Sequence, residues 1–207
     1  PKIDSAVLAM NDSIAKAQYM AQMAAPMYKD SLLEAASKAQ EEFFELENNK
    51  IKVTFTTKGA QAQQVLVKDY YTHDRLDLYL MKKGAGNFSV YFYTDQQLST
   101  TDFNFTKVGQ TDTSLVFRLQ FGENAYIEHE YTLADDSYMV DFNLRMVGMD
   151  KYISRKSGVA VDWNLDIPRL ERGYENEKNY STIAYKFPGD ENVEDLGLRK
   201  ADSKEEI

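Results

Sequence analysis

The sequence predicts a mainly β protein, an antiparallel β-sandwich preceded by an α-helical N-terminal segment. Apolar and polar residues alternate along most of the chain from about residue 47, which is the period of a strand with one buried face. Turn-forming residues separate these stretches at short intervals, as in sandwiches and barrels. Aromatic residues make up 13% of the chain, with 14 Tyr and 11 Phe, and both residue types favour strands. Helical stretches do not alternate with the strands, which argues against a parallel sheet.

The first 46 residues differ in composition, since they are rich in Ala, Met, Gln, Glu and Lys and contain no Gly. Pro26 is expected to divide this segment into two helices. Asp30 and Ser31 can cap the second helix, which we expect to end near Phe44. Its apolar stripe is thin, so residues 1–46 are predicted to be a helical linker.

About ten short strands are predicted between residues 47 and 189, which we expect to form the sandwich domain. Residues 84–87, Gly-Ala-Gly-Asn, are predicted to form a hairpin-like turn. Residues 190–207 are polar and acidic and are predicted to be an exit segment or tail. The clearest alternation runs through Ile51, Val53, Phe55; Leu76, Leu78, Leu80; Leu115, Phe117, Leu119, Phe121; and Ile127, His129, Tyr131, Leu133.

The single tryptophan, Trp163, alternates with Val161 and Leu165. This spacing places the three side chains on one face of a predicted strand. We expect that face to pack into the core, in preference to stacking on a ligand.

Charge and composition narrow the possible functions. The formal net charge is −9, which repels a phosphate backbone, so nucleic acid is not an expected partner. The chain has no cysteine and therefore no disulfide or thiolate metal site. No apolar run approaches the ~20 residues of a membrane span, and the chain opens without a signal peptide. The sequence therefore predicts a soluble chain or a soluble fragment.

Candidate catalytic groups are few. His73 lies in a turn-like stretch, and His129 lies within a predicted strand between Glu128 and Glu130. Neighbouring residues of a strand point to opposite faces, so these two carboxylates cannot join the imidazole in a metal site. No phosphate-binding loop, nucleophile elbow or dinucleotide-binding glycine pattern is present. We therefore predict no catalytic, cofactor-binding or metal-binding residue.

A dense group of charged residues between two predicted strands is the one candidate interaction site in the sequence. It consists of Arg169, Glu171, Arg172, Glu175 and Lys178. The segment could form a docking surface for another periplasmic domain. The alternative is a solvated loop with weak ion pairs.

Two stretches resemble the periplasmic domain of YidC-family membrane protein insertases. Residues 46–59, LENNKIKVTFTTKG, followed by VKDY at 67–70, resemble the opening strands of that domain. Residues 162–196, which begin DWNLDIPRLE and continue through ENEKNYSTIAYK, resemble a second segment of it. The helical segment before the first strand resembles the version found in Bacteroidetes. Ala60 stands where the family commonly has a second Gly, and a turn tolerates this if φ stays negative.

The resemblance implies that the full protein carries a transmembrane helix before Pro1. It also implies the rest of the periplasmic domain and a five-helix membrane core after Ile207. The expected fold is a supersandwich related to galactose mutarotase, at the periplasmic face of the bacterial inner membrane. The expected partners are nascent membrane proteins and the Sec translocon. The family's functional arginine lies among the membrane helices, outside this sequence, so no residue here is implied to be catalytic and no cofactor is implied.

The leading interpretation is therefore a non-catalytic interaction domain of an insertase. The alternative is a carbohydrate-binding or carbohydrate-modifying sandwich, because relatives of this fold include sugar epimerases. That alternative requires a cleft lined by aromatic rings, on which carboxylates and either His73 or His129 converge.

Overall fold

The computed structural model describes residues 28, 30–153, 158–187 and 189–197, which form two α-helices, two short 3-10 helices (η1, Thr100–Asp102, and η2, Met149–Lys151) and thirteen strands. The α-helices are α2 (Ser31–Lys38) and α3 (Tyr174–Tyr180). The strands are β1 (Phe43–Glu47), β2 (Ile51–Thr56), β3 (Gln61–Tyr71), β4 (Asp77–Met81), β5 (Gly86–Tyr93), β6 (Gln97–Ser99), β7 (Thr106–Gln110), β8 (Ser114–Gly122), β9 (Ala125–Leu133), β10 (Val140–Val147), β11 (Val159–Leu165), β12 (Thr182–Tyr185) and β13 (Glu194–Gly197).

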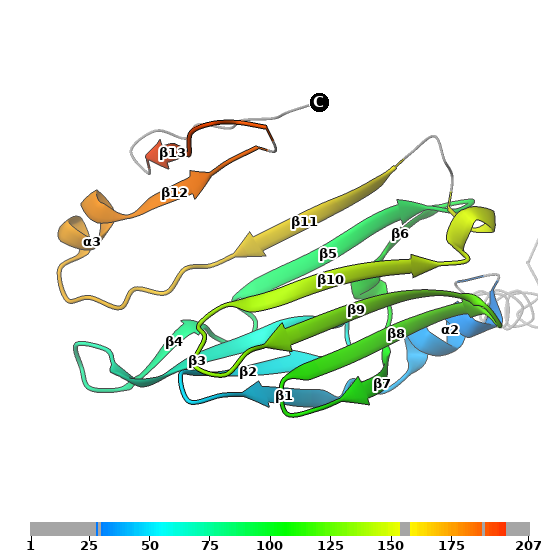
Figure 1. Ribbon diagram of the computed structural model, residues 1–207, viewed down its shortest axis with the longest axis horizontal. Helices are drawn as coiled ribbons and strands as arrows, with labels where there is room; N and C mark the ends of the chain where they lie inside the picture. Colours follow the sequence, from blue (N-terminus) through cyan, green and yellow to red (C-terminus); the bar gives the residue numbers. More distant parts are fainter. Residues whose placement is uncertain (1–27, 29, 154–157, 188, 198–207) are drawn as a thin grey trace, which may run out of the picture.

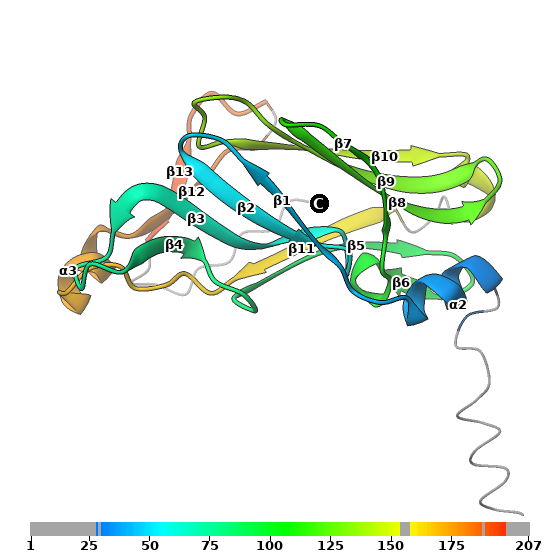
Figure 2. The same cartoon turned by 90° about the horizontal axis from the view of Figure 1, so that it is seen from below.

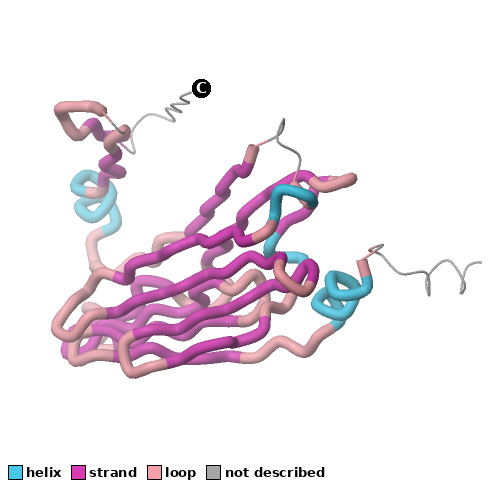
Figure 3. Tube along the Cα trace, turned by 45° about the vertical axis from the view of Figure 1, so that its right-hand side comes forward, coloured by secondary structure: helices cyan, strands magenta, loops and turns pink. Residues whose placement is uncertain are grey.

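The strands form antiparallel sheets in two layers, which confirms the predicted sandwich. One layer is the sheet β10-β9-β8-β7, and the other contains the sheets β1-β2-β3-β4 and β11-β5-β6 (Figure 1). Figure 2 shows the two layers edge-on. Helix α3 and the β12-β13 pair project from one end, whereas α2 lies at the other (Figure 3).

The core between the layers is aromatic. The Phe55 ring of β2 lies 4.5 Å from the Tyr131 ring of β9 and 6.4 Å from the Phe117 ring of β8, measured between centroids. The Phe92 ring of β5 meets the Phe121 ring of β8 at 5.8 Å. Strand β8 alternates between buried and half-buried residues along its whole length, as its sequence predicts. The sheets β1-β2-β3-β4 and β11-β5-β6 therefore both pack on the sheet β10-β9-β8-β7.

Helix α2 begins where the sequence predicts and ends earlier. The Asp30 carboxylate caps it by accepting a hydrogen bond from the Leu32 amide at 2.8 Å. The expected end near Phe44 is wrong, because Ala39 is already extended and Phe43–Glu47 pairs with β2. Tertiary pairing overrides the good helix propensity of this stretch. Leu33 is buried in the sandwich core, so this helix packs on the sheets.

Two other local predictions also need correction. The turn at residues 84–87 does not close a hairpin, because β4 and β5 belong to different sheets. Leu76 and Leu80 are exposed, whereas Met81 is buried, because the register between β3 and β4 shifts at irregularities.

Part of the predicted acidic tail, Glu194–Gly197, forms β13. The helix predicted before Pro26 and the chain beyond residue 197 lie outside the described residues.

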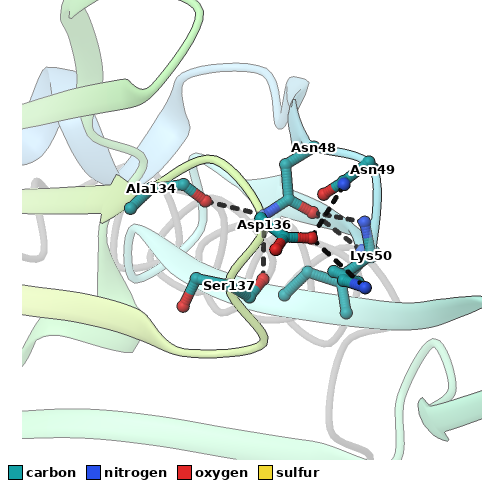
Figure 4. Close-up of polar contacts among 7 residues, drawn as sticks. Asn48, Asn49, Lys50, Ala134, Asp136 and Ser137 are labelled. Atoms are coloured by element: carbon teal, nitrogen blue, oxygen red, sulfur yellow. Dashed lines mark hydrogen bonds and ion pairs between the residues drawn. The ribbon is translucent and has the colours of Figure 1, made fainter.

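Asn48 fastens one end of the sandwich (Figure 4). It lies in the turn between β1 and β2, and its amide nitrogen donates to the carbonyl oxygens of Ala134 at 2.7 Å and Ser137 at 2.8 Å. Its amide oxygen accepts from the backbone N–H groups of Lys50 at 2.8 Å and Ile51 at 2.9 Å. One side chain therefore shapes its own turn and ties it to the β9–β10 turn of the opposite layer.

An ion pair supports the same contact from the surface. The Asp136 carboxylate accepts a hydrogen bond from the Asn49 amide at 2.9 Å and lies 3.2 Å from Lys50 Nζ. These two groups lower the pKa of Asp136, and Asp136 in turn raises the pKa of Lys50. Both charges are exposed to solvent, so we assign the pair little stability.

Asn48→Ala is expected to lower the free energy of unfolding by about 2–3 kcal/mol, because it removes four hydrogen bonds and leaves half-buried backbone groups unpaired. Asn49→Ala is the matched control. It loses one exposed hydrogen bond, so we expect a change within about 0.5 kcal/mol. Chemical denaturation followed by circular dichroism measures both values. Equal values for the two variants would show that Asn48 does not hold the layers together.

Candidate binding cleft

An apolar cleft of about 430 Å³ opens where the three sheets of the sandwich converge. The lining residues come from β2, β3 and β4 of one sheet, from β5 and β11 of a second, and from β9 and β10 of a third. Figure 1 shows how these strands are arranged. It is lined by Val53, Phe55, Gln61, Ala62, Val65, Leu80, Met81, Phe88, Tyr131, Val140, Phe142, Trp163 and Leu165.

Aromatic rings in edge-to-face contact run from the cleft into the core. The Trp163 ring lies 6.5 Å from the Phe88 ring, and the Phe88 ring lies 5.1 Å from the Phe142 ring, each at nearly a right angle. The Phe142 ring in turn contacts His129 and Tyr131, at 5.1 Å in both cases. Such pairs add stability beyond simple burial, so they hold the cleft wall in one arrangement.

The turn between β2 and β3 lies beneath the cleft. The carbonyl oxygen of Ala60 accepts two hydrogen bonds from β9, one from Tyr131 Oη at 2.6 Å and one from His129 Nδ1 at 3.1 Å. Ala60 has a φ of +48°, so the expectation that its φ stays negative is wrong. A positive φ is strained for alanine because of its Cβ atom. The two buried donors hold this carbonyl in place in spite of the backbone strain.

His129 is a core residue with no access to a substrate. It is fully buried among the rings of Phe88, Phe105 and Phe142. Burial lowers the pKa of His129 from 6.5 to about 4, so the imidazole is neutral near pH 7. Its Nδ1 donates to Ala60, and its Nε2 has no hydrogen-bond partner in the part of the chain that the structure describes.

The polar groups of the cleft wall are already engaged. Gln61 Oε1 accepts from the backbone N–H of Phe88 at 2.6 Å and so joins β3 to β5. Tyr131 donates to Ala60, and the deep burial of its ring raises the pKa of the hydroxyl. No carboxylate lines the cleft, and the described residues contain no group of three metal-ligating side chains. The arrangement therefore does not favour the carbohydrate alternative.

Trp163 lies at the mouth of the cleft, and the prediction that it packs into the core is wrong. The side chain is 69% exposed, and every residue of β11 is exposed. Period-two alternation correctly identifies the apolar face of β11. It does not show that anything covers that face, and β11 is the edge strand of its sheet.

The predicted charged docking segment lies between β11 and the end of α3, and none of its five residues is among those that line the cleft. Arg169 Nε lies 3.7 Å from the Glu177 carboxylate, which also accepts the backbone N–H of Leu170 at 2.9 Å. Glu171 and Arg172 are exposed in the loop, Glu175 is exposed on α3, and Lys178 belongs to the same helix. Arg169 therefore pairs with a residue of α3, whereas Glu171, Arg172 and Glu175 are exposed at the surface.

His73, the other candidate, lies in the β3–β4 turn. Its Nδ1 lies 3.3 Å from the Leu170 carbonyl, and its Nε2 lies 3.1 Å from Asp74. It is not among the residues that line the cleft, although the turn joins two strands that contribute to the lining. The two histidines therefore do not meet in one site.

The outer face of β9 contains a charge cluster around the buried Glu128 carboxylate, which the sequence patterns did not single out as a cluster. Glu128 is paired in register with Arg118 of β8 and Arg145 of β10. Arg118 Nη2 donates to Glu128 at 2.6 Å, and Arg145 Nη1 lies 3.4 Å from its second oxygen. The Arg118 guanidinium also stacks over the Tyr126 ring at 4.1 Å. The two arginines neutralise the buried Glu128 carboxylate, so the cluster joins the adjacent strands β8, β9 and β10 of this sheet.

Comparison with known proteins identifies the family. The family model described as the YidC periplasmic domain matches residues 44–203. This chain belongs to the YidC periplasmic-domain family. The match covers every strand from β2 to β13, as well as the two stretches that carry the resemblance.

Curated relatives named membrane protein insertase YidC support the assignment. The chain is 32% identical to that of Bacteroides fragilis over 176 residues, which is 84% of this chain. It is 32% identical to that of Porphyromonas gingivalis W83 over 179 residues and 29% identical to that of Cytophaga hutchinsonii over 155 residues. These organisms confirm the predicted Bacteroidetes type. The chain spans about 28% of the length of the Bacteroides relative.

Among solved structures, a GalM/aldose epimerase homologue from C. elegans is similar to part of the chain. The TM-score is 0.30 and the identity 13%, over 47% of this chain and 43% of the other. A similarity this slight implies nothing about the activity of the YidC domain. Among the described residues, no helix has the length and apolarity needed to cross a bilayer.

The geometry explains the first YidC-like stretch. Leu46 is buried in the core, Glu47 forms an ion pair with Lys68, and Asn48 ties the two layers together. Gly59 has a φ of +72° and lies against Thr101, so a side chain there would be strained and crowded. Leu46, Glu47, Asn48 and Gly59 therefore build the sandwich, whereas Val53 and Phe55 of the same stretch also line the cleft.

Proposed function

We propose that this chain is a non-catalytic docking domain of a membrane protein insertase at the periplasmic face of the inner membrane. The full protein inserts nascent membrane proteins, alone or with the Sec translocon, and this domain acts as a chaperone for their periplasmic segments. The family match over residues 44–203 carries the proposal. The cleft supports it, because its lining is apolar and holds no acid–base pair.

The charged segment is a second proposed contact of the same domain. Glu171, Arg172 and Glu175 are exposed, so they are accessible to a neighbouring periplasmic domain. Exposed charges at the edge of an interface affect the association rate and the choice of partner more than they affect affinity.

The test is photo-crosslinking in cells from single positions of the full-length insertase. A probe at Trp163 is expected to form adducts with newly made membrane proteins. A probe at Asn143, which is exposed on the outer face of β10, is the matched control and should form few. The proposal fails if neither position forms adducts, or if both form them equally.

A further inference from the structure

The end of helix α2 is held by a residue from a distant part of the chain. The last carbonyl groups of a helix have no partner within the helix, so they need another donor. The backbone N–H of Asn104 donates to the Ala36 carbonyl at 2.9 Å, and Asn104 Nδ2 donates to the Ala39 carbonyl at 2.8 Å. Asn104 is buried between η1 and β7, 65 residues beyond Ala39. One residue of the sandwich therefore satisfies two carbonyl groups where α2 ends.

The apolar face of α2 covers one end of the core (Figure 2). Leu33 is buried, Ala36 packs against the core, and the helix lies against β8. Tyr28, just before the helix, is also buried, and its ring lies 4.8 Å from the ring of Phe103, the neighbour of Asn104. Detaching α2 would expose these apolar side chains and leave buried polar groups without partners.

The short connection from α2 to β1 is also held in place. The backbone N–H of Glu42 donates to Thr57 Oγ1 at 2.9 Å, and the Glu42 carbonyl accepts from the Thr57 N–H at 2.9 Å. Thr56 Oγ1 donates to the Glu41 carboxylate at 2.6 Å. Thr57 Oγ1 in turn donates to Asn104 Oδ1 at 3.2 Å, so one cluster holds both the helix end and the connection. A hinge needs backbone bonds that can rotate, and these contacts restrict that rotation.

We propose that α2 is a rigid joint that fixes the direction in which the chain enters the sandwich, and that Asn104 is its positioning residue. The contacts reach back to Tyr28, whose backbone N–H donates to the Glu34 carboxylate at 2.9 Å. The sandwich and α2 then move as one body, so the joint limits where the surfaces of the domain can point. The joint depends only on contacts within the chain and is independent of the proposed function.

The absence of cysteine allows a direct measurement of this orientation, because two introduced cysteines can be spin-labelled selectively. Ala35→Cys on α2 and Asp112→Cys in the β7–β8 turn replace exposed residues. Double electron–electron resonance on the full chain with these two labels is expected to give one narrow distance distribution.

Asn104→Ala removes the side-chain donor to Ala39 and should release the end of α2. We expect the distance distribution to become at least about twofold broader and the α2 amides to exchange hydrogen at least about tenfold faster. Leu33→Ala is the second variant, because it removes the apolar contact and keeps both Asn104 donors. It should loosen the helix as well.

Asn48→Ala is the matched control. Asn48 also donates from its amide to distant carbonyl groups, but it lies at the other end of β1. This variant weakens the sandwich without touching α2, so the distance distribution should stay as narrow as in the parent chain. Circular dichroism establishes that each variant folds, and Leu33→Ala replaces Asn104→Ala in the comparison if the latter does not.

Three results would overturn the proposal. A broad distribution in the parent chain would show that α2 is a flexible linker. An unchanged distribution in folded Asn104→Ala would show that Asn104 does not position the helix. Equal broadening in Asn104→Ala and Asn48→Ala would show that α2 responds to the overall stability of the sandwich and not to its own contacts.

Discussion

Phe117→Ala is expected to lower the free energy of unfolding by about 3–5 kcal/mol, which is a large part of the stability of a domain of this size. The Phe117 ring is fully buried at the centre of the sandwich. It lies 5.9 Å from the Phe44 ring, 6.4 Å from the Phe55 ring and 6.5 Å from the Tyr131 ring. Truncation removes contacts to both layers at once and leaves a cavity that strands paired on both sides cannot collapse to fill.

Val116→Ala is the control for this prediction. Val116 precedes Phe117 on the same strand, but it is half-buried and points to the outer face. We expect it to cost about 1 kcal/mol or less. Guanidinium denaturation of both variants gives the comparison. A loss at Phe117 no larger than that at Val116 would show that the two layers do not pack on this ring.

The stability of the domain is expected to fall by about 3 kcal/mol between pH 6.5 and pH 4 because of His129 alone. The pKa of His129 is about 4 in the folded protein and 6.5 in its ordinary state, so the unfolded chain binds the proton first as the pH falls. The stabilising contribution is complete above pH 6.5 and is lost by pH 4. The physical reason is that a protonated Nε2 would lie among phenylalanine rings without an acceptor.

Substitution of each histidine isolates this effect. His129→Phe removes the titrating group, while Tyr131 still donates to the Ala60 carbonyl. Its free energy of unfolding should be lower at pH 7, but it should change much less between pH 6.5 and pH 4. His73→Phe keeps His129 and should lose stability as the parent does. The same pH dependence in all three proteins would assign the acid loss to other groups.

Much of the fold follows from the sequence where local and tertiary requirements agree. The alternation in β8 and β9 identifies inward and outward residues correctly, because both strands are central and one face of each is covered. The start of α2 follows from the Asp30 cap. The end of α2 could not be predicted in the same way, because the helix propensity of Glu41–Phe44 competes with pairing to β2. That pairing depends on residues outside the helical segment.

The cleft could not be predicted from the same patterns. Trp163 and Phe88 are paired in register although they lie 75 residues apart in the sequence, so their contact depends on the pairing of β11 with β5. The strained φ of Ala60 depends on donors that are 69 and 71 residues further along the chain. Sequence alternation predicts an apolar face, but whether that face is buried depends on the position of its strand in the sheet.

The Asn48 contact also sets an order for folding. It joins Asn48 to residues that lie 86 and 89 positions further along the chain. The Ala60 carbonyl likewise accepts hydrogen bonds only after His129 and Tyr131 have been made. Closing loops of this length loses chain entropy before the contacts that offset this loss have formed, so such topologies fold slowly. During synthesis, β1 and β2 leave the ribosome well before β9 and the β9–β10 turn that complete their packing. The first four strands must therefore remain incompletely packed until residue 137 has been made.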